Sequence, residues 1–212
     1  MSPGAVLVTG ANGGLGTAIF SKISSSHPEF HGLYTVRNPS TALNLQRLIN
    51  SAPSTHEHEV LALDLSSPDQ ICAFAKDVNS RVASGAVPRI RALILNAGFQ
   101  EATTQTLTEE KRDMTFAVNY LANFQLVLLL LESMDKEHGR IVFVSSWTHN
   151  PADPRCFGRS GKEKYLFTDT EGYVYPTTKP SEAGVRYGAS KLCLLMMMYG
   201  LPTLRYVFLI LD

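Results

Sequence analysis

Tyr187 and Lys191 stand four positions apart in the stretch GVRYGASKL, a spacing that could support acid–base chemistry. Four residues are close to one helical turn, so a helix would place both side chains on one face. A free phenol has a pKa of about 10, and a nearby ammonium group favours the phenolate and lowers that pKa. One interpretation of the pair is a proton donor and its helper, and the spacing alone does not decide for it. An aromatic and a charge on an ordinary amphipathic helix would show the same spacing.

A glycine-rich turn lies near the amino terminus, between an apolar run and a helical pattern. VLVTGANGGLGTAIF fits GxxxGxG through Gly10, Gly14 and Gly16, and also GxxGxxG through Gly10, Gly13 and Gly16. Glycines let a backbone approach a diphosphate closely, and the amides of a helix N-terminus favour its charge. We therefore expect dinucleotide binding, with a strand-to-helix turn that binds nothing as the alternative. The predicted loop residues are Gly10, Asn12, Gly13, Gly14, Leu15 and Gly16.

The end of the second predicted strand indicates which dinucleotide binds. NAD sites have an acidic residue there, about 20 residues beyond the glycine loop. This chain has no acidic residue between His31 and Ser40, and Arg37 stands where the acid is expected. A guanidinium matches a 2'-phosphate in charge and in forked geometry, so NADP(H) is favoured over NAD(H). The alternative is a surface arginine without a ligand.

The elements that must position these residues alternate between two patterns. Short apolar runs predict strands, and segments with helical periodicity separate them, which is typical of a parallel sheet covered on both faces. We therefore expect an α/β fold in one domain over residues 1–212, a Rossmann-like doubly wound parallel sheet flanked by helices. The expected strands are 5–10, 31–38, 59–65, 89–98, 139–146 and, with less support from its surroundings, 205–211, and the expected helices are 13–26, 41–50, 70–84 and 109–134.

Composition argues against several classes of partner. Lys and Arg number 19, as do Asp and Glu, so the chain has no overall charge that would attract nucleic acid. The apolar stretch 192–211 is interrupted by Gly200, Pro202 and Arg205, which favours a helix, a turn and a strand over a membrane span. His56 and His58 have no third ligand in view, so no metal site is expected.

The cysteine pattern bears on location. Cys72, Cys156 and Cys193 are far apart and odd in number, which fits a reducing compartment better than a disulfide framework. The amino terminus lacks the basic and apolar segments of a signal peptide. A cytoplasmic protein is therefore expected.

Five motifs in order resemble the single-domain branch of the short-chain dehydrogenase/reductase family. The similarity covers roughly residues 5–195, and the Asn-Ala-Gly element argues against the epimerase-like branch of that family. The motifs are Thr9-Gly10-xxx-Gly14-x-Gly16, Asn96-Ala97-Gly98, Asn119, Ser146 and Tyr187-xxx-Lys191.

The resemblance implies a catalytic set of Ser146, Tyr187, Lys191 and Asn119. Tyr187 would exchange a proton with the oxygen of a ketone, aldehyde or alcohol while the nicotinamide exchanges hydride with its carbon. Lys191 would also bind the nicotinamide ribose. Ser146 would hydrogen-bond the reacting oxygen, with Ser145 or a plain strand-end turn as alternatives. Asn119 would support a proton relay, or would only satisfy backbone groups at a helix irregularity.

The resemblance also implies cofactor contacts outside the glycine loop. Asn96, Ala97 and Gly98 would lie beside the cofactor at the end of the fourth strand, with Asn96 stabilising the central sheet. Asp64 and Leu65 would contact the adenine, although Asp64 could instead cap the next helix. Relatives commonly form homodimers or homotetramers through two helices that correspond to 124–131 and 192–198. We expect the same here.

Two departures from the family pattern stand out. Ser146 and Tyr187 are 41 positions apart, because a polar segment at 148–186 intervenes. We expect this segment to be a lid-like insertion near a pocket for a fairly large hydrophobic metabolite, such as a polyketide, terpenoid, steroid or retinoid, with a disordered segment as the alternative. The family normally continues past a sixth strand that ends in Pro-Gly, so the substrate region is expected to be incomplete. The alternative function is that of a catalytically impaired NADP-binding relative, truncated or regulatory.

Overall fold

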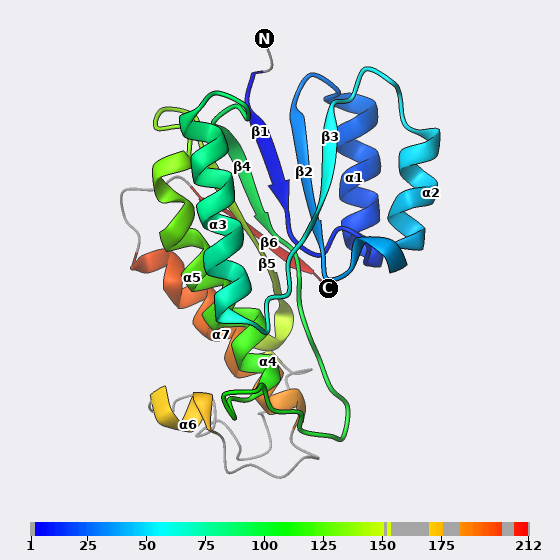
Figure 1. Cartoon of the computed structure of the whole chain (residues 1–212). Helices are drawn as coiled ribbons and strands as arrows, with labels where there is room; N and C mark the ends of the chain where they lie inside the picture. The colour runs from blue at the N-terminus through cyan, green and yellow to red at the C-terminus, as the bar shows by residue number, and fades with distance from the viewer. Residues whose placement is uncertain (1–2, 151, 154–169, 176–182, 201–205, 212) are drawn as a thin grey trace.

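The structure, a computed structural model of the whole chain, describes residues 3–150, 152–153, 170–175, 183–200 and 206–211. Six parallel strands form one sheet in the order β3-β2-β1-β4-β5-β6 (Figure 1). The predicted α/β fold and doubly wound parallel sheet are confirmed. The strands are β1 Ala5–Val8, β2 His31–Val36, β3 His58–Ala62, β4 Ile90–Leu95, β5 Arg140–Ser146 and β6 Tyr206–Leu211.

The chain begins in the middle of this sheet. It runs outward from β1 to β3, returns to place β4 on the other side of β1, and continues to β6. The order therefore reverses between β1 and β4, and Val8 of β1 is in register with Tyr34 on one side and Ile94 on the other. In open α/β sheets, ligands bind beyond the carboxyl ends of the strands at such a point.

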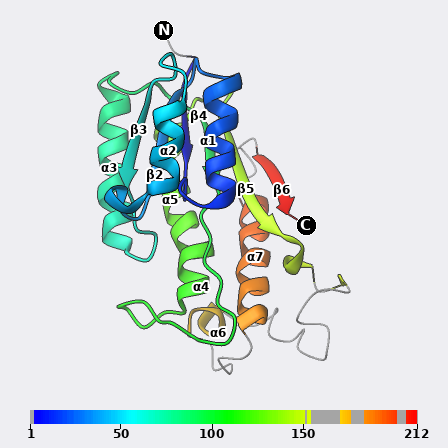
Figure 2. The ribbon, with the colours of Figure 1, turned by 90° about the vertical axis from the view of Figure 1, so that its right-hand side faces the viewer.

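Helices cover both faces of the sheet (Figures 1 and 2). On one face lie α1 (Gly14–Ser26) and α2 (Leu43–Ser51), and on the other lie α3 (Pro68–Ala83), α5 (Ala122–Leu130) and α7 (Ala183–Tyr199). The shorter helical elements are η1 Pro39–Thr41, α4 Met114–Phe116, η2 Ala117–Leu121, η3 Leu131–Ser133, η4 Trp147–His149 and α6 Thr170–Val174.

The fully apolar sequence of β1 follows from this double cover. Ala5 and Leu7 belong to the core beneath α3 and α5, whereas Val6 and Val8 belong to the core beneath α1 and α2. Successive side chains of a strand point to opposite faces, so a strand buried on both faces is apolar throughout instead of alternating.

The helix predicted over 109–134 begins later than expected. Lys111 has a φ of 64°, outside the helical range, and the Asp113 carboxylate accepts a hydrogen bond of 3.0 Å from the Phe116 amide as a cap. The helix therefore starts at Met114 and contains a π-helical turn, η2, before α5. The helical segment Met114–Ser133 is long and apolar enough to cross a membrane, and half of its most apolar stretch is buried within the protein. Core helices of globular domains share these properties.

The apolar stretch 192–211 divides as expected into a helix and a strand. It contains the last part of α7 and then β6, which pairs in parallel with β5 as the predicted sixth strand. Most of the predicted insertion 148–186 lies outside the described residues, as does Cys156. Its described part includes α6, which packs beside α4 and the start of α7 (Figures 1 and 2).

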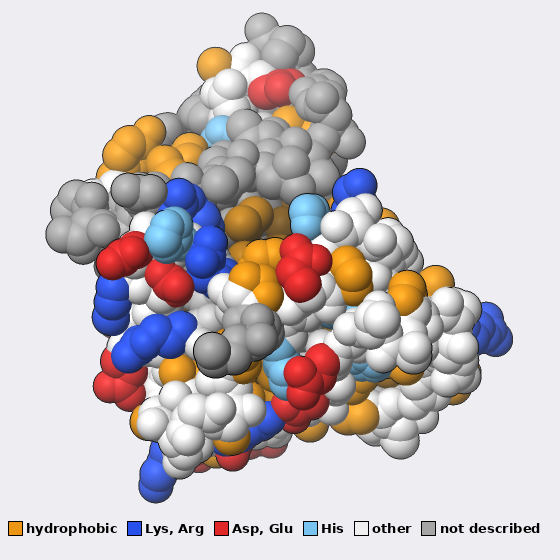
Figure 3. Space-filling view, turned by 90° about the horizontal axis from the view of Figure 1, so that it is seen from above, with side chains coloured by type: hydrophobic (Ala, Val, Ile, Leu, Met, Phe, Trp, Pro, Cys, Tyr) orange, Lys and Arg blue, Asp and Glu red, His pale blue; other side chains and the backbone are white. Residues whose placement is uncertain are grey.

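The surface around the amino ends of the strands carries mixed charge. Seen from the end where β1 begins, acidic and basic side chains are interspersed with apolar and neutral groups (Figure 3). This distribution matches the balance of 19 basic and 19 acidic residues in the chain.

Candidate active site

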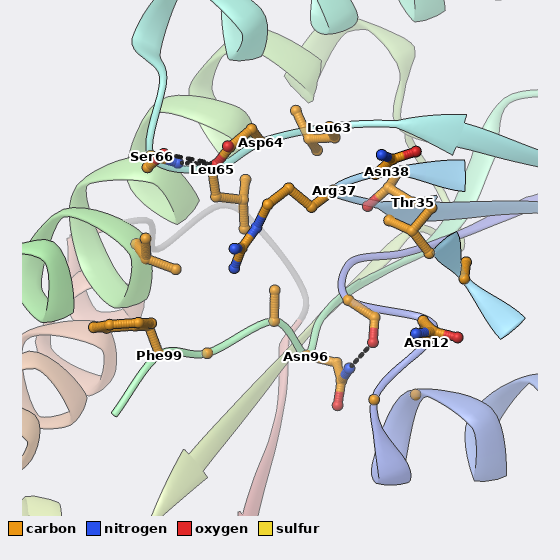
Figure 4. Close-up of a pocket in the computed structure, with 18 of the residues that line it drawn as sticks. Asn12, Thr35, Arg37, Asn38, Leu63, Asp64, Leu65, Ser66, Asn96 and Phe99 are labelled. Carbon is orange, nitrogen blue, oxygen red and sulfur yellow. Dashed lines mark hydrogen bonds between the residues drawn. The ribbon is translucent and has the colours of Figure 1, made fainter. Parts of the chain in front are cut away.

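A cleft of about 750 Å³ lies at the point where the strand order reverses. Its walls come from the segments that follow β1, β2, β3 and β4, so residues far apart in the sequence meet there (Figure 4). Every predicted cofactor residue outside the Tyr187 and Lys191 pair lines this cleft. These residues are Gly10, Asn12, Gly13, Gly14, Leu15, Gly16, Arg37, Asp64, Leu65, Asn96, Ala97 and Gly98.

Two of the loop glycines are required by the protein's own backbone. Gly10 has a φ of 67°, which side chains rarely tolerate, and a Cβ on Gly16 would lie 2.3 Å from the Gly10 carbonyl oxygen. A Cβ on Gly14, by contrast, would meet no protein atom within 4 Å, and one on Gly13 would meet only the Gly10 oxygen at 3.5 Å. Contacts within the protein therefore explain why Gly10 and Gly16 are glycines. They do not decide between GxxxGxG, with Gly14 in the middle, and GxxGxxG, with Gly13 in the middle.

The glycine loop opens α1 without a side-chain cap. Gly13 is the residue before the helix, and no side chain hydrogen-bonds the first amides there. The loop is instead anchored from the other side, where Asn12 accepts a hydrogen bond of 3.0 Å from the Leu45 amide of α2. The helix N-terminus thus presents its amides and its positive dipole to the cleft, which suits an anionic ligand.

Thr9 and Asn96 join the two strands that flank the reversal. The Thr9 hydroxyl accepts hydrogen bonds of 3.0 Å from the amides of Asn96 and Ala97. The Asn96 side chain donates to the carbonyls of Thr9, at 2.9 Å, and Gly10, at 3.2 Å (Figure 4). The predicted role of Asn96 in stabilising the central sheet agrees with these bonds. Thr9 appeared in the sequence only as part of a motif, and its bonds to β4 require the tertiary structure.

Arg37 is the cationic side chain of the cleft wall. It is exposed and extends from the end of β2 into the cleft, on the side of Leu65 (Figure 4). Asp64 lines the same wall, where its carboxylate accepts hydrogen bonds from the amide and the hydroxyl of Ser66, at 2.9 and 2.7 Å. The alternative role of Asp64 as the helix cap is wrong, because the Ser67 hydroxyl caps α3.

Ser146 and Tyr187 come together although 41 positions separate them. Ser146 ends β5, Tyr187 lies in the first turns of α7, and the Ser146 hydroxyl lies near enough to the phenol of Tyr187 to favour the phenolate and lower its pKa. Ser145 points to the other face of the strand, and its buried hydroxyl has no hydrogen-bond partner among the described residues. The geometry therefore favours Ser146 over Ser145 as the hydroxyl beside the phenol.

Lys191 is buried one helical turn after Tyr187. Its ammonium nitrogen lies 5.6 Å from the centre of the Tyr187 ring and donates a hydrogen bond of 3.1 Å to the Val144 carbonyl. Burial lowers the pKa of Lys191 to about 8. Burial raises the pKa of the Tyr187 phenol, and the nearby Ser146 hydroxyl opposes that rise only in part. The expected lowering of the Tyr187 pKa is therefore wrong for this structure, because desolvation of the phenol outweighs the interaction with Ser146 that favours the phenolate.

Asn119 sits in the π-helical turn, where the helix irregularity directs its side chain between two other segments. Its side-chain oxygen accepts a hydrogen bond of 2.7 Å from the Phe99 amide, and its nitrogen donates to the Phe99 carbonyl and to the Ser190 hydroxyl, both at 3.0 Å. Asn119 thus links the segment after β4 to α7. The alternative expectation, that Asn119 satisfies backbone groups at a helix irregularity, agrees with these bonds. The bonds lie close to Lys191.

Gly98 marks the place where the cleft meets this polar cluster. A Cβ on Gly98 would lie 3.5 Å from the Asn119 side-chain oxygen and 3.6 Å from the Lys191 nitrogen. The four predicted catalytic residues do not themselves line the 750 Å³ cleft, whose end is formed near them by Gly98, Phe99, Met114 and Val118.

Comparison with known proteins identifies the family. A family model described as short chain dehydrogenase matches residues 4–154. The chain belongs to the short-chain dehydrogenase family. It is 43% identical to the short-chain dehydrogenase iccH of Talaromyces variabilis and 28% identical to the oxidoreductase fscI of Fusarium equiseti, over 92% and 73% of this chain. These alignments cover 62% of each relative, so the chain spans about three fifths of their length.

Solved structures of other oxidoreductases share the fold. A metagenomic short-chain oxidoreductase in complex with NADP superposes with a TM-score of 0.70 at 24% identity, over 100% of this chain and 82% of that one. An NADPH-bound carbonyl reductase from chicken fatty liver gives a TM-score of 0.67 at 21% identity, over 99% and 79% of the two chains.

Other clusters of titratable side chains in this short-chain dehydrogenase form structural contacts. His56 is hydrogen-bonded to the Tyr34 hydroxyl at 2.9 Å, and its ring stacks on His58 with centroids 5.4 Å apart. No group of three His, Cys, Asp or Glu side chains suited to a metal ion occurs within the described part of the chain. Cys72 is exposed and Cys193 is buried, both as free thiols.

Proposed function

We propose that this short-chain dehydrogenase is an NADP(H)-dependent enzyme that interconverts a ketone or aldehyde with an alcohol. The observation that carries the proposal is the place of the Ser146 hydroxyl, near enough to the Tyr187 phenol to oppose the rise of its pKa, with Lys191 buried one turn away beside the cleft. When bound, the nicotinamide cofactor would supply or accept the hydride at the substrate carbon. The protein residues would then manage the proton and the substrate oxygen.

Tyr187 is proposed as the proton donor in the reductive direction. Its phenol proton would pass to the carbonyl oxygen as the carbon receives hydride, so that the products are an alcohol, the oxidised cofactor and a Tyr187 phenolate. Lys191 would stabilise that phenolate by charge, and Ser146 would donate a hydrogen bond where negative charge develops on the oxygen. Asn119, which bonds both Phe99 and Ser190, would hold the helix and the segment after β4 around Lys191.

The cleft fits a dinucleotide phosphate in several independent ways. The space beside Gly14 is open to a diphosphate, and the start of α1 offers uncapped amides. Arg37 supplies a cation suited to a 2'-phosphate, which supports NADP(H) over NAD(H). Asp64 and Leu65 line the wall proposed for the adenine.

A hydrophobic substrate is proposed from the walls near Gly98. Phe99, Met114 and Val118 make that end of the cleft largely apolar.

The cytoplasmic location remains a prediction from the cysteine pattern.

Self-association through α5 and α7 is a further part of the proposal. Apolar side chains on both helices are exposed, with Phe124 at 38%, Leu128 at 45% and Met196 at 59%. Buried neighbours on the same helices, such as Leu126 and Leu194, belong to the core. Each helix therefore serves the core on one side and offers an apolar face on the other. Sedimentation is expected to show a homodimer or homotetramer, and a monomer at micromolar concentration would contradict this.

The test separates cofactor binding from chemistry. NADPH affinity is measured by fluorescence, and oxidation of bound NADPH is followed in single turnovers with a panel of hydrophobic ketones and aldehydes. The proposal predicts NADPH oxidation by wild-type protein and a loss of at least about a hundredfold in Tyr187→Phe with affinity retained. Binding of NADPH without oxidation by any carbonyl would support a catalytically impaired NADP-binding protein instead.

A further inference from the structure

A buried ion pair lies next to the proposed proton donor and is not used in the chemistry above. The Arg186 Nε atom is 3.1 Å from an oxygen of Asp113, and the two side chains are 4% and 0% exposed. No other ion pair between described residues is buried on both sides. Since desolvation offsets most of the attraction within a buried ion pair, such a pair points to a role other than stability.

Asp113 organises the segment that carries Asn119. Its carboxylate accepts hydrogen bonds from the Phe116 amide at 3.0 Å and the Gln105 side chain at 3.3 Å. Its own amide donates to the Val174 carbonyl of α6 at 2.9 Å. Asp113 therefore fixes where α4 begins, and the π-helical turn with Asn119 follows directly from α4.

Arg186 organises the start of α7 from the other side. It precedes Tyr187 in the chain, and its guanidinium also donates a hydrogen bond of 2.7 Å to the Thr104 carbonyl. The helix turn that carries Tyr187 is thus tied both to α4 and to the loop that follows Phe99. That loop is the one held by Asn119 through the Phe99 amide. Two connections, one through Asp113–Arg186 and one through Asn119, therefore join the same three segments.

We propose that Asp113 and Arg186 form a positioning pair that sets the place of the Tyr187 phenol relative to Ser146 and Asn119. This assignment rests on the proposed function, because it gives the pair a role in proton transfer by Tyr187. Neither residue touches the reacting atoms in this scheme. Proton transfer depends steeply on donor geometry, so a small rotation at the start of α7 would slow the chemical step while leaving the dinucleotide cleft intact.

The test compares Asp113→Asn, Arg186→Met and the double variant with two controls. Glu59→Gln disrupts the partly exposed pair between Glu59 and Arg81 on the far edge of the sheet, and Val78→Ala removes methyl groups from the core of α3. Each protein is assayed for NADPH affinity, single-turnover oxidation and the ¹³Cζ signal of labelled Tyr187. That signal is assigned by its loss in Tyr187→Phe and reports the hydrogen bonding of the phenol.

The positioning role predicts a specific pattern. Each single variant slows the chemical step by roughly 10- to 100-fold and shifts the Tyr187 signal, while NADPH affinity is unchanged. The double variant is no slower than the slower single variant, because either change alone already breaks the pair. Arg186→Lys, which keeps the charge without the fork, gives an intermediate rate and serves if the other variants fold poorly.

The opposite pattern would overturn the assignment. A rate and a Tyr187 signal that match those of Val78→Ala at equal loss of stability would show that the pair is only structural. Failure of the proposed function is a separate result. In that case none of the carbonyl compounds would support NADPH oxidation by the wild-type protein. In that case the Tyr187 signal alone decides, and an unshifted signal in Asp113→Asn rejects the pair's role.

Discussion

The ammonium nitrogen of Lys191 lies 5.6 Å from the centre of the Tyr187 ring, inside the protein rather than in solvent. Burial lowers the pKa of Lys191 to about 8 from 10.5 and raises the pKa of the Tyr187 phenol. Both shifts disfavour the charged forms. Burial of the charged Lys191 therefore lowers the stability of the fold, and it places a cation where a phenolate would form.

Replacement of Lys191 by Met is expected to stabilise the protein at neutral pH. In the unfolded chain the lysine has its ordinary pKa, so between pH 8 and 10.5 the unfolded state binds more protons and wild-type stability rises with pH. Below pH 8 the full cost of the buried charge remains. After allowance for the lost bond to Val144, Lys191→Met should raise the free energy of unfolding by about 2 kcal/mol at pH 7.

Urea titrations of both proteins at several pH values measure this difference. The gain should shrink as the pH rises above 8 and should be gone above 10.5, the ordinary pKa of a lysine side chain. The exposed Lys76→Met on α3 serves as the control and should show no such dependence. A gain that stays constant from pH 7 to 11 would mean that the charge of Lys191 is not its source.

Arg37 is expected to select the cofactor. Its guanidinium extends into the cleft, so Arg37→Ala should weaken NADPH binding by about tenfold and leave NADH binding almost unchanged. Fluorescence titrations with each cofactor measure the ratio. Arg47→Ala, on the exposed side of α2, is the control for a change in net charge. Equal losses for NADPH and NADH would contradict a role in binding the 2'-phosphate.

Gly14 and Gly16 should respond to the same substitution in opposite ways. Gly16→Ala places a Cβ 2.3 Å from the Gly10 oxygen, so it should destabilise the fold by about 1 to 3 kcal/mol. Gly14→Ala meets no protein atom within 4 Å and should leave thermal stability unchanged or slightly higher. Calorimetry and NADPH titration test both variants. If the diphosphate binds beside Gly14, the Gly14→Ala variant should bind NADPH more weakly while keeping its thermal stability. Unchanged NADPH affinity would contradict a diphosphate site beside Gly14.

Asn119 should prove important for both stability and chemistry. Asn119→Ala leaves the partly buried Phe99 amide and carbonyl without their partner, at a cost of about 1 to 3 kcal/mol. It also releases the contact with Ser190 of α7, so the single-turnover rate should fall. Asn79→Ala is a matched control, because that side chain also donates to a backbone carbonyl, that of Leu129, and lies away from the cleft. Chemical denaturation and NADPH oxidation measure the two effects.

Much of the fold and site follows from local sequence. Apolar runs and helical periodicity predict the strands and the order of the elements, because burial on two faces of a sheet demands continuous apolar strands. The family motifs single out Ser146, Tyr187 and Lys191, which the fold brings together at the end of β5 and the start of α7. Local sequence also predicts the glycine loop, whose conformation at Gly10 depends on the absence of a side chain.

Other features depend on which segments meet in space. The sequence alone does not show that Asp113 pairs with Arg186, that Thr9 holds the Asn96 amide, or that the helix with Asn119 starts only at Met114. Desolvation, which reverses the expected direction of the Tyr187 pKa, is likewise set by the packing around it. Residue type and spacing determine which groups can act, whereas burial, long-range hydrogen bonds and charge pairing arise only when the chain has folded.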